Sequence, residues 1–267
     1  YTNGIASFVP GLLPELALRL SVRDTLALLE ERIGTGALET ALDPAQKIAG
    51  PVSEETDSRW ITRANMAGIN VRTLGSFWQI IPYSLTLPAA QSTVHLLPFW
   101  EPGVVASLYG MASWRINPEF FSPELKEALP ALDTPAKQLK AVVNLLHATG
   151  RSVGMDVIPH TDRYSEIVLA NPHYFEWLQR DDLEIVDHRA GLHEEVQEAL
   201  LAFLKKEGSA TGGLEWPGRR EAFFSREFPE EKRAAVLFGP GSDYAGRGRR
   251  RSAIVRRLYD YGYEPVP

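Results

Sequence analysis

A short apolar run that ends in polar side chains has the clearest capacity for chemistry in this chain. It covers residues 154–162, with the sequence GMDVIPHTD. A run of this length between Gly and Pro predicts a buried strand, and α/β proteins bind ligands at the carboxyl ends of parallel strands. Asp156, His160 and Asp162 are therefore expected in one site, where carboxylates and an imidazole hydrogen-bond the hydroxyl groups of a substrate.

An earlier loop adds aromatic and acidic residues to this expected site. It follows a predicted strand at 93–99 and begins with Trp100 and Glu101, with Tyr109 further along. Neighbouring loops of a barrel converge on one mouth. Aromatic rings cover the apolar faces of a sugar while carboxylates bind its hydroxyl groups, so a sugar is the ligand that this set suits. The residues predicted to bind substrate are Trp100, Glu101, Tyr109, Asp156, His160 and Asp162.

Structural roles compete with several of these assignments. Asp156 is equally suited to hydrogen-bond the backbone where its strand ends. Trp100 is equally suited to pack in the core or against a loop. His95, which alternates within the strand at 93–99, and His147, near the end of a helix, are interpreted as structural.

Other site chemistries are not favoured. Metal-ligand residue types occur, but their spacing fits no compact ligand pattern, and no metal site is predicted. These residues are His160, Asp162, His188 and His193. The GPGS segment at 239–242 lacks the Lys-Ser/Thr pair of a phosphate-binding loop, and no Gly-x-Ser-x-Gly elbow occurs.

A strand–helix–strand unit is predicted to position the site. Strands are expected at 93–99 and 153–158, joined by a helix at 134–150. Thr134 and Pro135 suit the N-cap and first turn of that helix, and Gly150 suits its end. The crossover should be right-handed. The alternation of short apolar runs with helical ones predicts an α/β fold built on a partial or incomplete (β/α)8 barrel of the TIM type.

Changes of pattern along the chain divide it into three predicted regions. They are a helical N-terminal arm at 1–66, the first βα units of the barrel at 67–162, and a mixed helical insertion after the third strand at 163–267. Within the last region, helices are expected at 171–180 and 193–207. The basic run at 247–251 is interpreted as a solvated loop leading into a helix, with partner binding as the alternative.

Composition narrows the choice of partners. The 267 residues carry a net charge of -6, which argues against nucleic acid or an anionic membrane as a partner. The chain has no cysteine, so disulfides and thiolate metal sites are excluded. No apolar run of about 18 residues occurs, so no membrane span is predicted.

The stretch from about Gly68 to Asp162 resembles the front of the α-amylase superfamily barrel, glycoside hydrolase family 13. In that family the second strand runs into a Pro-containing turn and a Gly-Tyr-Asp loop that ends in Asn-Pro or Asp-Pro. LPFW at 97–100 and Asn117-Pro118 stand in those places. The third strand carries Asp-Val-Val-x-Asn-His, which DVIPHT at 156–161 resembles. The Asn before the His is missing here, so calcium binding through it is not expected, and no other cofactor is predicted.

The resemblance implies an α-amylase-like glycoside hydrolase or transglycosylase that acts on α-glucan oligo- or polysaccharides. Asp156 would orient the site, His160 would hydrogen-bond the sugar, and Tyr109 would stack on it. The family's Gly-x-Arg-x-Asp strand and acid Glu have no match here. Because a retaining glycosidase needs two carboxyl groups about 5 Å apart, no catalytic residue is assigned and the reacting carboxylates are expected beyond Pro267. The alternative is a non-catalytic carbohydrate-binding or scaffold protein with an amylase-like barrel mouth.

Overall fold

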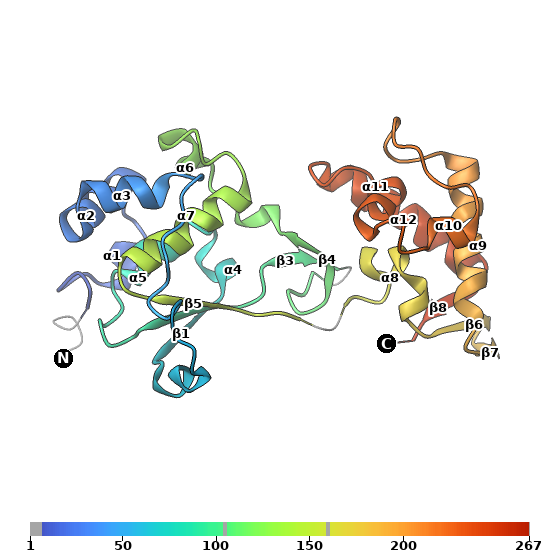
Figure 1. The fold of residues 1–267 in the computed structure, drawn as a ribbon, viewed down its shortest axis with the longest axis horizontal. Coiled ribbons are helices and arrows are strands. Elements are labelled where there is room, and N and C mark those ends of the chain that lie inside the picture. The colour runs from blue at the N-terminus through green and yellow to red at the C-terminus, as the bar shows by residue number, and fades with distance from the viewer. Residues whose placement is uncertain (1–6, 104–105, 159–160, 267) are drawn as a thin grey trace. The chain divides into compact units, whose positions relative to one another are not determined.

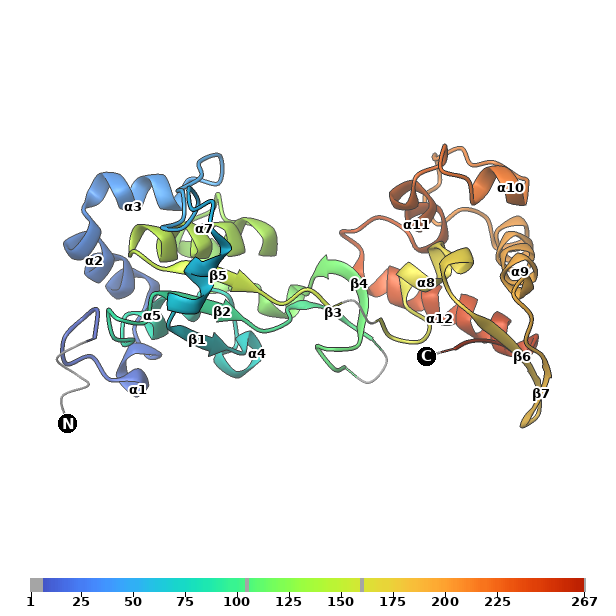
Figure 2. The same cartoon turned by 60° about the horizontal axis from the view of Figure 1, so that its bottom comes forward.

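The chain forms two compact units. A computed structural model describes residues 7–103, 106–158 and 161–266, and Figures 1 and 2 show it from two directions. The first unit runs up to Phe99 and includes Ile116–Ile158, and the second comprises Trp100–Arg115 and the chain after Ile158. The polypeptide therefore passes between the units three times.

The first unit is built on a three-stranded parallel sheet in the order β1-β2-β5. The strands are β1 (Met66–Ile69), β2 (Thr93–Leu96) and β5 (Ser152–Met155). Gly68, His95 and Gly154 are in register across the three strands. Successive residues of a strand point to opposite faces, so these three share one face, while the fully buried Val94 and Leu96 face the other way.

The crossover helix of this sheet is α7 (Pro135–Ala148), which lies along β5 in Figure 1. The Thr134 hydroxyl accepts a hydrogen bond from the Lys137 N–H at 3.2 Å, and Pro135 occupies the first turn. Gly150 follows with a φ of +81°, a value that Gly adopts without strain. The strand–helix–strand prediction for this region is confirmed.

Short helices complete the first unit. The longest of them, α2, begins at the N-cap Ser21, whose side chain accepts from the Asp24 N–H. The loop before α6 is held by the fully buried Gln138 of α7, which accepts from the Ser122 N–H at 2.7 Å. These elements are α1 (Pro14–Ala17), α2 (Val22–Ile33), α3 (Thr35–Leu42), η1 (Ser58–Arg63), α4 (Val71–Leu74), α5 (Ile80–Ser84), η2 (Pro118–Phe120) and α6 (Pro123–Ala128).

Two small sheets belong to the second unit. One pairs β3 (Trp100–Pro102) with β4 (Met111–Ile116), whose last residue reaches the first unit. The other has the order β7-β6-β8 and is antiparallel throughout. Its strands are β6 (Trp177–Asp181), β7 (Glu184–Asp187) and β8 (Tyr263–Pro265).

Helices of the second unit enclose an apolar core beside the second sheet. The core includes Trp177, Phe223 and Phe238, each exposed by 2% or less. The central helix α12 packs against α9 and α11. The helices are α8 (Glu166–Ala170), η3 (Pro172–Tyr174), α9 (Leu192–Glu207), α10 (Arg220–Phe223), α11 (Glu230–Phe238) and α12 (Tyr244–Asp260). The helix predicted at 193–207 is confirmed as α9.

The prediction of a partial (β/α)8 barrel is wrong. In the described part of the chain, the parallel sheet ends at β1 on one side and β5 on the other, and it does not curl toward closure. The strands after β5 do not extend its ladder, because they hydrogen-bond among themselves in the β7-β6-β8 sheet. What was predicted as an insertion into a barrel is instead most of a second compact unit with its own core.

Two local predictions are also wrong, both because distant partners decide the outcome. The helix expected at 171–180 is the short η3 turn followed by β6, whose backbone pairs with β7 and β8. The basic run at 247–251 is not a loop but the first half of α12. Arg247 is buried there against two carboxylates from other elements, Glu101 and Glu166, which neutralise its charge.

Candidate functional site

The residues predicted to bind substrate are divided between the two units. Asp156 belongs to the first unit, whereas Trp100, Glu101, Tyr109 and Asp162 belong to the second. The remaining predicted residue, His160, lies outside the described residues. Each unit therefore presents its own candidate site.

In the first unit, the Asp156 carboxylate is fixed by a histidine on the neighbouring strand. His95 Nε2–H donates to Asp156 Oδ1 at 2.8 Å, from the middle of β2 to the residue that follows β5. The Asp156 N–H continues the parallel ladder by donating to the Leu96 carbonyl at 3.1 Å. Asp156 is two residues beyond Gly154, so strand alternation puts its side chain on the same face as His95.

A glycine on the neighbouring strand β5 makes room for the His95 ring. A Cβ at Gly154 would lie 2.6 Å from His95 Nδ1, so any side chain at that position would displace the imidazole. A Cβ at Gly68, on the other side, would meet only Leu97 Cδ1 at 3.7 Å, an ordinary contact. The His95–Asp156 pair thus lies on a stretch of sheet that carries no bulky neighbour at Gly68 or Gly154.

The pair is accessible as well as ordered. The His95 and Asp156 side chains are 33% and 30% exposed. An ordered carboxylate on a half-open sheet face can accept hydrogen bonds from the hydroxyl groups of a polar ligand, while the imidazole that donates to it keeps it oriented.

In the second unit, the predicted aromatic and acidic residues have separate roles. Trp100 packs edge to face on Trp114, with ring centroids 5.4 Å apart. Tyr109 is 54% exposed, whereas Asp162 is packed so closely on Gly103 that a Cβ at residue 103 would lie 2.4 Å from it. Tyr109 is therefore open to solvent, and Asp162 helps to pack the loop between β3 and β4.

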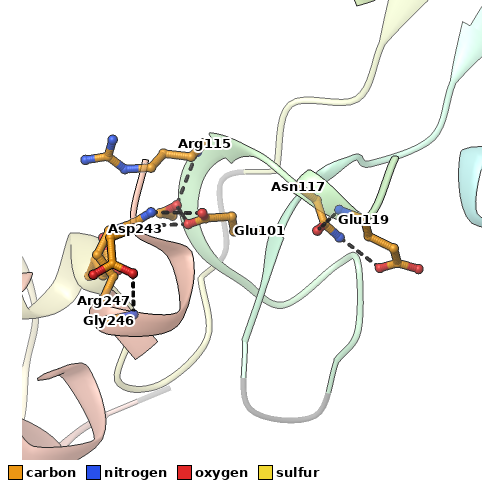
Figure 3. Close-up of polar contacts among 9 residues, drawn as sticks. Glu101, Arg115, Asn117, Glu119, Asp243, Gly246 and Arg247 are labelled. Carbon is orange, nitrogen blue, oxygen red and sulfur yellow. Dashed lines mark hydrogen bonds and ion pairs between the residues drawn. The ribbon is translucent and has the colours of Figure 1, made fainter. Parts of the chain in front are cut away.

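Glu101 is the centre of a buried ionic cluster, shown in Figure 3. Arg247 donates to both Glu101 carboxylate oxygens at 2.9 Å, a bidentate pair, and the Ser113 hydroxyl also donates to Glu101. The same guanidinium donates to Glu166 at 2.5 Å. The side chains of Glu101, Arg247 and Glu166 are exposed by 5%, 2% and 7%. Glu101 thus joins β3 to α12, and Glu166 joins α8 to the same arginine.

Burial and charge act in opposite directions on these groups. Burial raises the pKa of Glu166 above its ordinary value, although Arg247 acts to lower it. Burial also opposes the charge on Arg247, but the hydrogen bonds to Glu101 and Glu166 outweigh it and hold the pKa of Arg247 above its usual value. The surroundings in the cluster therefore favour the charged form of Arg247 and disfavour the charged form of Glu166.

A cavity of about 530 Å³ lies beside the cluster, within the second unit. Glu101, Glu166 and Arg247 form part of its wall, and most of the rest comes from α12. Its volume is within the range of small-molecule sites in proteins.

The sequence did not reveal three of the residues that now define these sites: His95, Glu166 and Arg247. His95 was interpreted as structural. It lies in a predicted strand, and Gly154, with which it pairs, lies in the next predicted strand; this was the signal that could have indicated a site. The partners of Arg247 are 81 and 146 residues away in the chain, and no local pattern indicates them. Within the described ranges, no group of three or more His, Asp or Glu residues gathers in a way that could hold a metal ion.

Comparison with known proteins adds no relative. The sequence matches no protein-family model, and no curated protein is significantly similar to it. Among the described residues, no helix combines the length and apolar character needed to cross a bilayer.

Proposed function

We propose that this chain acts on α-glucans, as an α-amylase-like glycoside hydrolase or transglycosylase, and that the His95–Asp156 pair binds the sugar. The observation that carries the proposal is the 2.8 Å hydrogen bond between His95, within β2, and Asp156, just after the carboxyl end of β5. This hydrogen bond supports the sequence resemblance, because it orders Asp156, the first residue of the resembled motif, and leaves that residue partly exposed. Gly68 and Gly154 leave the sheet beside it free of side chains, which suits a flat sugar ring.

In this proposal Asp156 accepts from sugar hydroxyl groups, and His95 keeps the carboxylate oriented. Both are positioning and binding groups, and bond cleavage is assigned to neither.

The test is a calorimetric titration of the protein with maltooligosaccharides. Asp156→Asn keeps the shape of the side chain but removes its charge, and a lost charge-assisted hydrogen bond of about 1.5–3 kcal/mol predicts binding weakened by roughly 10-fold or more. Gly154→Ala, which displaces the His95 ring, should weaken binding in the same direction. Gly36→Ala in α3 of the same unit is the matched control, because nothing lies within 4 Å of its added Cβ. Equal affinity of all four proteins would refute the site.

A second candidate function is carbohydrate binding without catalysis. It is favoured by Glu101, the carboxylate predicted at the loop after β2, which is committed to Arg247 and Ser113. Release of reducing ends from the same oligosaccharides separates the two functions. Turnover that is lost in Asp156→Asn supports the enzyme, whereas tight binding with no turnover supports the binding protein.

A further inference from the structure

Four arginines of α12, Arg247, Arg249, Arg251 and Arg256, line the cavity next to the Glu101–Arg247 cluster. Ala245, Gly248, Ser252 and Arg256 follow one another at helical spacings of three and four, so they share a face. That face and its flank, with Arg247, Arg249 and Arg251, line the cavity of about 530 Å³. The opposite wall comes from Glu101, Pro102 and Ala112, with Glu166 from α8.

The wall of this cavity carries more positive than negative charge. Arg247 is neutralised by its two carboxylate partners. Among the described residues, the exposed Arg249 and Arg256 make no hydrogen bond or ion pair, and Arg251 acts on Glu166 only through space. An excess of positive charge is thus held together on one wall, in a chain whose net charge is -6. Like charges brought together on one helix face repel, and an anion would relieve that repulsion.

Donors without acceptors lie in or behind the cavity wall. Arg247 Nε is enclosed by protein without a hydrogen-bond partner in the described part of the chain, although the other guanidinium nitrogens are bonded. At the start of α12 the Asp243 side chain accepts from the Gly246 N–H only, which leaves the N–H groups of Tyr244 and Ala245. Tyr244 and Ala245 line the same cavity from the first turn of α12. The first backbone N–H groups of an α-helix have no intrahelical acceptor and favour a nearby anion.

We propose that this cavity binds the phosphate group of a small hydroxylated phosphate monoester. Guanidinium groups match phosphate oxygens in geometry as well as in charge. The Ser252 hydroxyl, which lines the cavity, can accept a hydrogen bond from a ligand hydroxyl group, and the carboxylates of Glu101 and Glu166 disfavour a second anionic group. The ligand therefore has one phosphate and a neutral polar body. This inference is independent of the proposed sugar site, which lies in the other unit.

The experiment is a calorimetric titration of the whole chain with glucose 6-phosphate, inorganic phosphate and glucose, at one ionic strength set with sodium chloride. Glucose 6-phosphate should bind more tightly than about 1 mM and more tightly than inorganic phosphate, and glucose should not bind at this cavity. Arg249→Ala and Arg256→Ala should each weaken the sugar phosphate by about 10-fold. Arg257→Ala is the matched control: it removes the same charge from the same helix, at a residue that bonds Tyr261 and does not line the cavity.

Four results would overturn the proposal. No binding of either phosphate compound would remove the site, and equal affinity for both would remove the hydroxylated body from it. A loss in Arg257→Ala as large as in Arg256→Ala would show a diffuse charge effect instead of a cavity. A short single-stranded oligonucleotide that binds more tightly than glucose 6-phosphate would make the arginine face a nucleic-acid surface.

Discussion

Removal of the Arg247 guanidinium should be among the most destabilising single changes in the second unit. Arg247→Met keeps the length and apolar stem of the side chain but leaves Glu101 and Glu166 buried without their shared cation. Three hydrogen bonds of 2.5 to 2.9 Å would be lost from a group that is 2% exposed. Leaving a buried charge uncompensated costs about 3–5 kcal/mol, a large part of the roughly 5–15 kcal/mol that stabilises a domain.

The ion pair itself contributes less than this loss suggests, and a rescue variant shows the difference. Replacing all three charges with apolar side chains, as Arg247→Met with Glu101→Met and Glu166→Met, removes the uncompensated carboxylates. Replacement of a buried ionic cluster by apolar residues of similar volume is often without cost. The triple variant should therefore recover most of the stability that Arg247→Met loses.

The measurement is a urea titration read by hydrogen exchange of α9 peptides, which report on the second unit alone. Arg249→Met is the control, since Arg249 is exposed and should change the free energy of unfolding by no more than about 0.5 kcal/mol. A loss below about 1 kcal/mol in Arg247→Met would refute the reasoning, as would a triple variant no more stable than the single one.

Two further predictions concern single residues of the second unit. Because burial raises the pKa of Glu166 above the ordinary 4.5, its contribution to stability is present below that pH and is lost as pH rises through the raised value. Urea midpoints of the wild type relative to Glu166→Gln should therefore fall as pH rises above 4.5 and then level off; a difference that is constant or rises would contradict this. Gly262→Ala should cost about 2–5 kcal/mol, because φ is +73° and the new Cβ would lie 2.0 Å from the Arg180 carbonyl oxygen. Gly208→Ala, with φ of +75° and open space around it, should cost only about 1–2 kcal/mol, and equal melting temperatures for the two variants would refute the clash.

Local signals in the sequence predicted the elements that such signals control. Thr134, Pro135 and Gly150 mark both ends of α7 because capping is a property of neighbouring residues. The parallel strands on either side of that helix were also predicted from a local signal, the short apolar runs of the sequence. The sequence pattern indicates Asp156 as a candidate residue, and this stays a prediction; the hydrogen bond that His95 donates to it from a neighbouring strand was not predicted.

Long-range pairing explains what the sequence did not predict. The residues of β6 follow a turn and could continue a helix, but backbone pairing with β8, more than 80 residues later, makes them a strand. The arginine run became a helix because Glu101 reaches Arg247 across 146 residues and Ile254 and Leu258 face the core. The prediction of a barrel is wrong for the same reason, because the local alternation of strands and helices does not determine which strands pair.

The way the chain is divided between the units limits how it can be dissected. The second unit takes Trp100–Arg115 from the middle of the first unit's sequence, and Glu101 comes from that segment. A fragment that starts after Ile158 would keep α12 but would lose the bidentate partner of Arg247, and one cut in the polypeptide would not release the unit intact. Separate expression of the second unit would need the β3–β4 segment supplied in the same chain, for example by a circular permutation that joins it ahead of α8.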